Sequence, residues 1–420
     1  FFYRIFLSHA IGAEGLGLYQ LILPLQGLMA ALSYTGIQSA LSRLIASRLA
    51  LQEKKEAYFS LVTGIFAAVF FSAVTGFLLF RHADFFASTI LKAPGTSDLL
   101  RLTAASIPLC AIHSCIDSYY YARKKASVPA AVQLSEQTVR IGATYILYLI
   151  FLSEGRPVTA MIAAGGSLAG EAAASLISLL MVSFHFGNHP VKEKTSVKIF
   201  PLIKDLFTLS FPISLNRILL TLLGSIEAVL IPQMLIRCGM TSSEALKIYG
   251  IFTGMALPLL LFPSTITTSA AVMLMPSVAR MDALGDQKQI RYVTDQTFFL
   301  CMFLGFLCGS GFFLFGPFLG TLLFHSKTAG TYIRYLSFIC PFLYTNTMLA
   351  SILQGLGRPG RCLIHSAAGI LIRIFSVVFM IPAIGIRGYF YGIFLGELLL
   401  SLLHVKALKF PYRQAGDNRL

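Results

Sequence analysis

Charged residues are scarce in this sequence. Only 12% of its 420 residues are Asp, Glu, Lys or Arg, whereas soluble proteins carry about 25%. The apolar set Ala, Val, Ile, Leu, Met, Phe, Trp, Tyr and Cys makes up 56%, and the mean hydropathy is +0.75. So few polar side chains cannot cover a surface that faces water, which excludes soluble, disordered and collagen-like proteins. We therefore interpret the chain as an integral membrane protein.

Several chemical signatures are missing. The seven cysteines form no C-x-x-C pair and no zinc-type spacing. We interpret the eight histidines as scattered, so we expect no disulfide framework and no metal site. There is no G-x-x-x-x-G-K loop for a nucleotide and no D-x-x-D pair for a magnesium diphosphate. The acidic pair that comes nearest to such a motif is Asp282 and Asp286. We expect no cofactor and no enzymatic activity.

Acidic residues are outnumbered by basic ones. The 18 Asp and Glu against 33 Lys and Arg give a formal net charge of +15. Cytoplasmic loops of membrane proteins collect Lys and Arg, so this excess does not require a nucleic-acid partner. One set of alternate loops holds more than twice as many basic residues as the opposite set. The positive-inside rule then predicts that both termini lie in the cytoplasm.

Long apolar runs are what the sequence has in abundance. A helix that crosses a membrane needs about 20 predominantly apolar residues. Such runs lie near residues 1–11, 18–35, 58–80, 100–121, 130–151, 159–184, 207–235, 248–268, 292–315, 332–351, 362–381 and 388–405. They predict an all-α polytopic membrane protein with about 12 transmembrane helices.

The two halves of the chain repeat each other. The aligned features are I-A-S-R at 45–48 with V-A-R-M at 278–281, Arg140 with Arg373, and Glu171 with Glu397. Because each half has six spans, both halves start on the same side, which predicts parallel repeats with a substrate path between two lobes. The predicted divisions are an amino-terminal six-helix lobe at 1–190, a cytoplasmic linker at 191–205, a carboxy-terminal six-helix lobe at 206–405 and a cytoplasmic tail at 406–420.

Four stretches carry a resemblance to a known family. They are I-G-A-E-G-L-G-L-Y-Q at 11–20, L-S-Y-T-G-I-Q-S-A-L-S-R-L-I-A at 32–46, the segment 249–280 that begins Y-G-I-F-T-G-M-A-L-P, and Q-G-L-G-R-P at 354–359. The first two closely resemble the stage V sporulation protein B-like branch of the polysaccharide biosynthesis (export) family. That family belongs to the multidrug/oligosaccharidyl-lipid/polysaccharide (MOP) flippase superfamily. The resemblance extends over essentially the whole chain.

The resemblance implies a MATE-like fold with a pseudo-twofold axis and an alternating-access flippase in the plasma membrane of a bacterium. Its substrate would be an undecaprenyl-diphosphate-linked sugar, such as a lipid II-like peptidoglycan or polysaccharide precursor, with cell-wall synthases as candidate partners. The coupling ion is left open among Na⁺, H⁺ and the membrane potential alone. Related lipid II flippases can have fourteen helices, and their eighth helix carries an Arg where this chain has Phe252 and Thr253.

Charged side chains inside the predicted spans are the candidate site residues. A charge at mid-span costs about 2.5–3.5 kcal/mol, so its presence needs a partner or an aqueous cavity. Guanidinium groups bind phosphate oxygens in pairs, which makes the buried arginines candidate ligands of a diphosphate. The predicted lining of a central cavity is Arg4, Arg140, Arg217, Arg373 and Asn216. The candidate coupling or counter-charge residues are Glu136, Glu171, Glu227 and Glu397.

Structural ion pairs are the alternative for these charges. We expect Glu171 and Glu397 to pair with the arginines of the neighbouring helices, and Glu136 lies one turn before Arg140 on the same helix face. Arg217 and Glu227 also lie on nearly one helix face, and for them both pairing and transport stay open.

Three other functions compete with the flippase. A cation-coupled multidrug antiporter of the same superfamily would need an acidic or aromatic cavity, whereas four arginines in the spans favour an anionic substrate. A membrane-embedded glycosyl- or prenyltransferase would need the clustered acids that this sequence lacks. A purely structural scaffold would not explain charges within the membrane.

Overall fold

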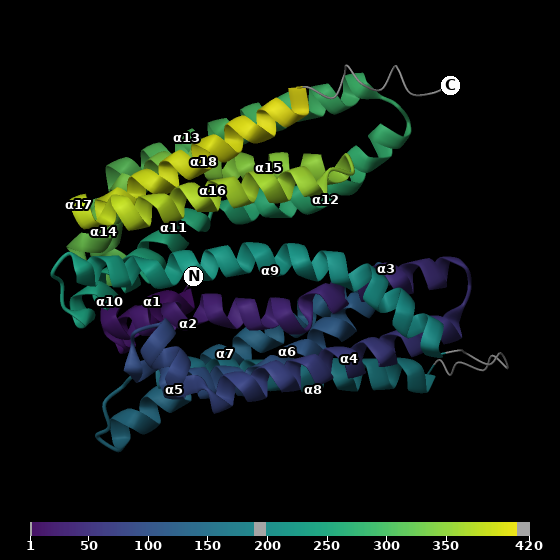
Figure 1. The fold of residues 1–420 in the computed structure, drawn as a ribbon, viewed down its shortest axis with the longest axis horizontal. Helices are drawn as coiled ribbons and strands as arrows, with labels where there is room; N and C mark the ends of the chain where they lie inside the picture. The colour runs from purple at the N-terminus through teal and green to yellow at the C-terminus, as the bar shows by residue number, and fades with distance from the viewer. Residues whose placement is uncertain (1, 189–198, 410–420) are drawn as a thin grey trace. The chain divides into compact units, whose positions relative to one another are not determined.

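The helices of this chain are seen in a computed structural model that describes residues 2–188 and 199–409. In these two ranges every regular element is helical (Figure 1). Apolar runs of membrane length account for this, because a helix satisfies its backbone hydrogen bonds within the segment, as a lipid environment requires. The predicted all-α class is confirmed.

The chain forms two compact units. The amino-terminal unit comprises residues 18–225, and the carboxy-terminal unit comprises residues 1–17 and 226–420. Two helices belong to both units, namely α2 (Gly12–Ser33) and the continuous helix α9 (Ile199–Arg237). Helix α1 (Phe2–Ala10) belongs to the carboxy-terminal unit.

The remaining helices follow in chain order. The amino-terminal unit contains α3 (Thr35–Ala50), α4 (Lys54–Arg81), α5 (Ala83–Phe85), α6 (Ser97–Ala122), α7 (Ser127–Ser153) and α8 (Met161–Asn188). The carboxy-terminal unit contains α10 (Ser242–Gly250), α11 (Leu257–Leu261), α12 (Ser264–Ala283), α13 (Gln287–Phe324), α14 (Lys327–Leu336), α15 (Cys340–Gly355), α16 (Pro359–Phe379), α17 (Ile381–Ile384) and α18 (Ile386–Lys409).

The predicted lobes group the helices differently from these units. The sequence predicts a linker at 191–205, but α9 is already helical from residue 199 and belongs to the amino-terminal unit as far as residue 225. Residues 189–198 of that linker and residues 410–420 of the predicted tail lie outside the described residues. The tail residues 406–409 are the end of α18.

Ten helical stretches within the described ranges are long and apolar enough to cross a membrane. They correspond to ten of the twelve predicted runs. The other two, near 1–11 and 130–151, are the helices α1 and α7. Helix α1 has nine residues, and α7 contains the polar side chains Gln133, Glu136, Gln137 and Arg140. Of these side chains, Glu136 is buried, Gln137 and Arg140 are half-buried, and Gln133 is exposed.

Two further helices were not predicted as such: α3 follows the predicted run 18–35, and α12 shares only its first five residues with the predicted run 248–268. Apolar length does not reveal them, because each mixes polar and basic residues with its apolar ones. The end of α3 is held by ion pairs of Arg48, whose nitrogens lie 3.0 Å from Glu53, 2.6 Å from Glu56 and 3.0 Å from Asp205 of α9. The hydrogen bond to Glu53 raises the pKa of Arg48 above its ordinary value.

Each unit buries an apolar core of its own. In the amino-terminal unit, α3, α4 and α6 pack together around residues such as Leu41, Leu61 and Tyr119. In the carboxy-terminal unit, α12 and α15 pack around Val278 and Leu353.

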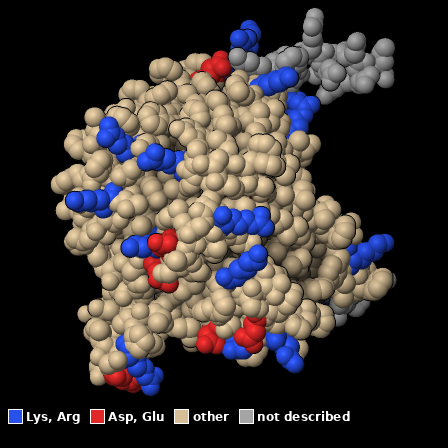
Figure 2. All heavy atoms as spheres, turned by 60° about the vertical axis from the view of Figure 1, so that its left-hand side comes forward, with Lys and Arg blue, Asp and Glu red and all other residues tan. Residues whose placement is uncertain are grey.

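Other large apolar side chains face outward. Helix α13 exposes Phe299, Phe303 and Phe306 on one face, and α4 exposes Phe66 and Phe70. Figure 2 shows a face on which uncharged residues occupy most of the surface and charged ones stand in small groups. Exposed apolar area on this scale is typical of contact with lipid.

Candidate functional site: two buried ion-pair networks

The amino-terminal unit contains a buried network centred on Arg140 of α7. Its guanidinium contacts Glu136, one helical turn earlier, and lies 3.2 Å from Oε1 of Glu171 on α8. The side chains of Glu136 and Glu171 are each 11% exposed. In this low-dielectric surrounding the carboxylates would be costly without the guanidinium.

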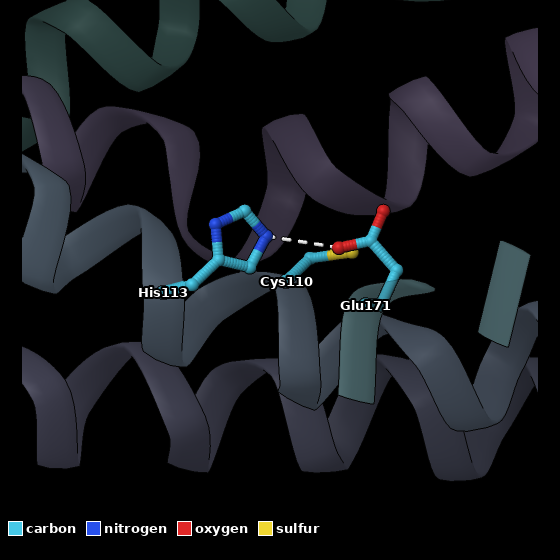
Figure 3. A group of neighbouring side chains, drawn as sticks. All are labelled: Cys110, His113 and Glu171. Carbon is cyan, nitrogen blue, oxygen red and sulfur yellow. Dashed lines mark hydrogen bonds and ion pairs between the residues drawn. The ribbon is translucent and has the colours of Figure 1, made fainter. Parts of the chain in front are cut away.

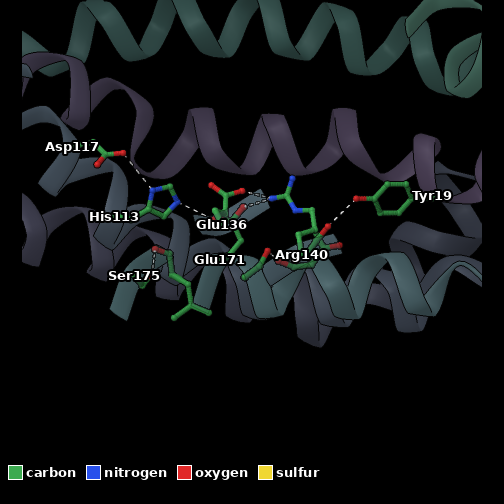
Figure 4. A network of polar contacts seen from close by, with 11 residues as sticks. Tyr19, His113, Asp117, Glu136, Arg140, Glu171 and Ser175 are labelled. Carbon is green, nitrogen blue, oxygen red and sulfur yellow. Dashed lines mark hydrogen bonds and ion pairs between the residues drawn. The ribbon is translucent and has the colours of Figure 1, made fainter. Parts of the chain in front are cut away.

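The network continues from Glu171 to α6. Nε2 of His113 lies 2.9 Å from the second carboxylate oxygen of Glu171, and Nδ1 of His113 lies 3.7 Å from Asp117. Asp117, His113, Glu171 and Arg140 therefore form one connected line across α6, α8 and α7 (Figure 4). The two oxygens of Glu171 are divided between a histidine and an arginine.

The carboxy-terminal unit contains a second network centred on Arg373 of α16. Its Nε and Nη2 lie 2.7 and 3.2 Å from the two carboxylate oxygens of Glu227, and its Nη1 lies 3.3 Å from Glu397 of α18. The hydroxyl of Tyr389 donates to Glu227 at 2.7 Å, and the amide of Asn346 donates to Glu397 at 2.8 Å. Each oxygen of the two carboxylates therefore accepts at least one hydrogen bond.

Both networks are built on the same local sequence. Helix α8 carries Gly166-x-x-x-Gly170-Glu171, and α18 carries Gly392-x-x-x-Gly396-Glu397. Glycines at this spacing let two helices approach closely. A Cβ at Gly166 would lie 1.9 Å from Oγ1 of Thr144 and 2.9 Å from the carbonyl oxygen of Arg140. The close approach therefore brings each glutamate to the arginine helix.

The glycines of this repeat lead to a stability prediction. A Cβ at Gly392 would lie 2.3 Å from Cβ of Ser376, on the helix that carries Arg373. We expect Gly166→Ala and Gly392→Ala to lower the free energy of unfolding by about 1–3 kcal/mol through overpacking, measured by thermal unfolding in detergent. Gly142→Ala on α7 is the matched control, because no atom lies within 4 Å of its added Cβ. Equal stability of all three variants would contradict the close-packing role.

The predicted glutamate–arginine pairs are present. Arg140 contacts Glu171 and Arg373 contacts Glu397, and Glu136 contacts Arg140 at the predicted i, i+4 spacing. Of the two possibilities left open for Arg217 and Glu227, their pairing is not present, because both oxygens of Glu227 are held by Arg373. Ten residues of α-helix also span roughly 15 Å, which is long for a direct side-chain contact.

The other predicted cavity residues lie outside both networks. Arg4 of α1 donates from Nη1 to the carbonyl oxygen of Thr253 at 3.2 Å, within a π-helical turn of residues 251–256. Arg217 and Asn216 are exposed on α9. A common cavity lined by these residues stays a prediction.

Sequence reasoning missed the α6 side of the first network. Cys110, His113 and Asp117 are spaced i, i+3 and i+7, which places them on one face of a helix. Cys110 lies beside His113 and Glu171, and one potential metal-ligating atom from each of the three falls within 4.8 Å of the others. The spacing of the three residues on α6 is visible in the sequence. Zinc motifs, however, are recognised by ligands close together along the chain, so they do not reveal that Glu171 on α8 joins this group.

Comparison with known proteins shows which family this chain belongs to. A family described as "Polysaccharide biosynthesis protein" matches residues 1–282. The chain belongs to this family. It is 28% identical over 413 residues to stage V sporulation protein B of Bacillus subtilis (strain 168). The alignment covers 96% of this chain and 78% of that protein. It is 22% identical to sporulation protein YkvU of the same organism, covering 100% of this chain and 94% of that protein.

Solved structures of the MOP superfamily share the fold. The lipid II flippase MurJ in an inward closed conformation superposes with a TM-score of 0.73 at 13% identity, covering 97% of this chain and 84% of that one. The MATE transporter VcmN of Vibrio cholerae in its bent form gives a TM-score of 0.65 at 15% identity, covering 97% and 95%. The predicted family and fold are confirmed, and these relatives are transporters and flippases rather than enzymes.

Proposed function

We propose that this chain is a flippase that moves an undecaprenyl-diphosphate-linked sugar from the cytoplasmic to the outer leaflet of a bacterial plasma membrane, where cell-wall synthases would use it. Family membership and the MOP fold support a transporter. The choice of an anionic substrate rests on Arg217.

Arg217 is the single observation that carries the proposal. It is exposed near the middle of α9, in the stretch Phe200–Arg237 that is long and apolar enough to cross a membrane. Arg217 has no ion pair with any residue that the structure describes. A guanidinium at that depth is costly against lipid, so it requires an aqueous path or an anionic substrate. Asn216, also exposed, adds a neutral hydrogen-bonding group beside it.

Arg140 and Arg373 have a different role in this proposal. Each is already engaged by two carboxylates, so neither guanidinium is available to a diphosphate without breaking buried ion pairs. We assign both arginines to counter-charge roles that hold the helices of their own unit together. In the carboxy-terminal network two carboxylates face one guanidinium, which suits coupling to Na⁺ or H⁺.

A cation-coupled multidrug antiporter is the second candidate. The observation that favours it is the likeness to MATE transporters, one of them described as a multidrug resistance transporter in an outward-facing conformation with a TM-score of 0.69. The excess of buried carboxylates would also suit a cationic substrate. The two candidates differ in the charge of the ligand that binds.

Ligand-dependent thermal stability separates these candidates. A ligand that binds only the folded protein stabilises it by about 2.7 kcal/mol at a hundred times its dissociation constant. We expect undecaprenyl-diphosphate-linked sugar to raise the unfolding temperature of the purified chain, and undecaprenol without the diphosphate to leave it unchanged. Stabilisation by a lipophilic cationic dye and not by the lipid-linked sugar would support the antiporter.

The orientation in the membrane is a separate prediction. Lys54 and Arg81 are exposed at the two ends of α4. With the exposed Cys238 replaced by Ser, Lys54→Cys should react with a membrane-impermeant thiol reagent only after the membrane is opened. Arg81→Cys should react in intact cells. The reverse pattern would show that the termini face outward.

A further inference from the structure

The α6 side of the first network brings together three types of metal ligand. Cys110 and His113 come from successive turns of α6, and Glu171 comes from α8 (Figure 3). Cys110 and Glu171 are buried, and His113 is half-buried. One ligand atom from each residue lies within 4.8 Å of the other two. This is a preformed group of sulfur, nitrogen and oxygen donors in the interior of one unit.

The sulfur, nitrogen and oxygen donors match a divalent metal ion of intermediate softness, such as Zn²⁺. Zn²⁺ binds Cys sulfur at about 2.3 Å, His nitrogen at about 2.0–2.1 Å and carboxylate oxygen at about 2.0–2.2 Å, in a tetrahedron. Donor atoms around such an ion lie roughly 3.3–3.7 Å apart, while Nε2 of His113 and Oε2 of Glu171 are 2.9 Å apart. Small side-chain rotations therefore convert the group into three ligands with a fourth position open.

Asp117 supplies the outer partner that a histidine ligand commonly has. Metal-bound histidines donate their other ring N–H to a carboxylate, which fixes the ring orientation. Nδ1 of His113 lies 3.7 Å from Oδ2 of Asp117. Both Nδ1 of His113 and Oδ1 of Asp117 are buried without a hydrogen-bond partner among the described residues. A shift of roughly 1 Å would bring this contact to hydrogen-bond distance while Nε2 binds the ion.

The surrounding charges favour a divalent cation. The carboxylates Asp117, Glu136 and Glu171 face one guanidinium, that of Arg140, and one imidazole, that of His113. Arg140 holds Oε1 of Glu171 and leaves Oε2 on the His113 side. An ion bound there would therefore leave the Arg140 pair intact.

We propose that Cys110, His113 and Glu171 form a binding site for a borderline divalent transition-metal ion of the Zn²⁺ class, with Asp117 as a positioning residue. Binding replaces the thiol proton of Cys110, which leaves to solvent. The ion cross-links α6 to α8 within the amino-terminal unit. This site is independent of the transported substrate proposed above.

Cobalt is the probe that reports the sulfur ligand directly. The full chain, purified in detergent and freed of metal with a chelator, is titrated with Co²⁺ alone. We expect a thiolate-to-cobalt charge-transfer band that saturates at one ion per chain and is lost in Cys110→Ser. Cys115→Ser is the matched control, because Cys115 is buried on the same helix outside the donor group. It should keep the band.

Three outcomes would overturn the site. They are the absence of a charge-transfer band in the native chain, a band that survives in Cys110→Ser, and a cobalt signal without sulfur character. The last would place the ion elsewhere, for example at the exposed pair of His9 and His325, whose ring nitrogens are 2.7 Å apart.

Asp117 and His113 are tested by affinity. Zn²⁺ displaces Co²⁺ from the band, so competition gives both affinities in each variant. We expect Asp117→Asn to keep one ion per chain and to lower the affinity roughly ten- to a hundredfold, as losses of outer partners do. His113→Gln, which removes a ligand, should lower it further. Unchanged affinity in both variants would contradict the proposed coordination, whatever the chain transports.

Discussion

Arg373→Met is expected to destabilise the protein more strongly than either Gly166→Ala or Gly392→Ala. Glu227 and Glu397 are only 5% and 7% exposed, and Arg373 is the cation that both contact. Removing one partner of a buried ion pair typically costs about 3–5 kcal/mol, because the remaining charge stays in a low-dielectric site. The expected result is a large fall in unfolding temperature and in folded yield.

A charge-matched variant separates the loss of stability caused by unpaired charges from the loss caused by the changed shape of the side chain. Adding Glu227→Gln and Glu397→Gln to Arg373→Met removes the uncompensated charges, so most of the lost stability should return. Arg291→Met is the control. Arg291 pairs with Asp295 at 3.8 Å, and the two side chains are 78% and 73% exposed. Exposed pairs of this kind contribute little to the free energy of unfolding. If Arg373→Met unfolded like the native chain, the counter-charge role of Arg373 would be wrong.

Arg217→Ala is expected to have the largest effect on transport. Losing one hydrogen-bonded charge contact costs about 1.5–3 kcal/mol, which corresponds to roughly a ten- to hundredfold loss of affinity for the diphosphate. Because Arg217 is exposed and has no ion pair among the described residues, folded yield should stay close to normal. Arg217→Lys keeps the charge without the planar fork and should be intermediate.

Lys204→Ala is the matched control for Arg217. Lys204 is an exposed basic residue on the same helix, near its start. Its removal should leave transport of the lipid-linked sugar unchanged. Equal loss in both variants would show a general effect of positive charge on α9, and equal activity in both would remove Arg217 from the proposed substrate path.

Periodicity and composition predicted most of the fold because lipid imposes one simple requirement, about 20 apolar residues per helix. Helices α3 and α12 lack such a run, so the requirement did not predict them. Helix α3 packs against α4 and α6, and α12 packs against α15. The lobe boundary also differed, since the continuous α9 reaches from one unit into the other. The order of helices along the chain does not show which unit a helix joins.

The ion pairs were predictable where the internal repeat placed an arginine and a glutamate at matching positions. The partner of Glu227 was not, because Arg373 is 146 residues away and only the packing of α16 brings them together. His113 and Cys110 were missed for the same reason. Their spacing places them on one face of α6, but the group of possible metal ligands is complete only with Glu171 of α8.

Translocation of a lipid-linked sugar by the purified chain is the most direct test of the proposed flippase activity. Proteoliposomes containing the chain would carry fluorescent undecaprenyl-diphosphate-linked sugar in one set and a lipophilic cationic dye in another, with empty liposomes as the control. We expect the chain to move the sugar headgroup between leaflets and to leave the dye in place. Dye movement without any transfer of the lipid-linked sugar would contradict the proposal.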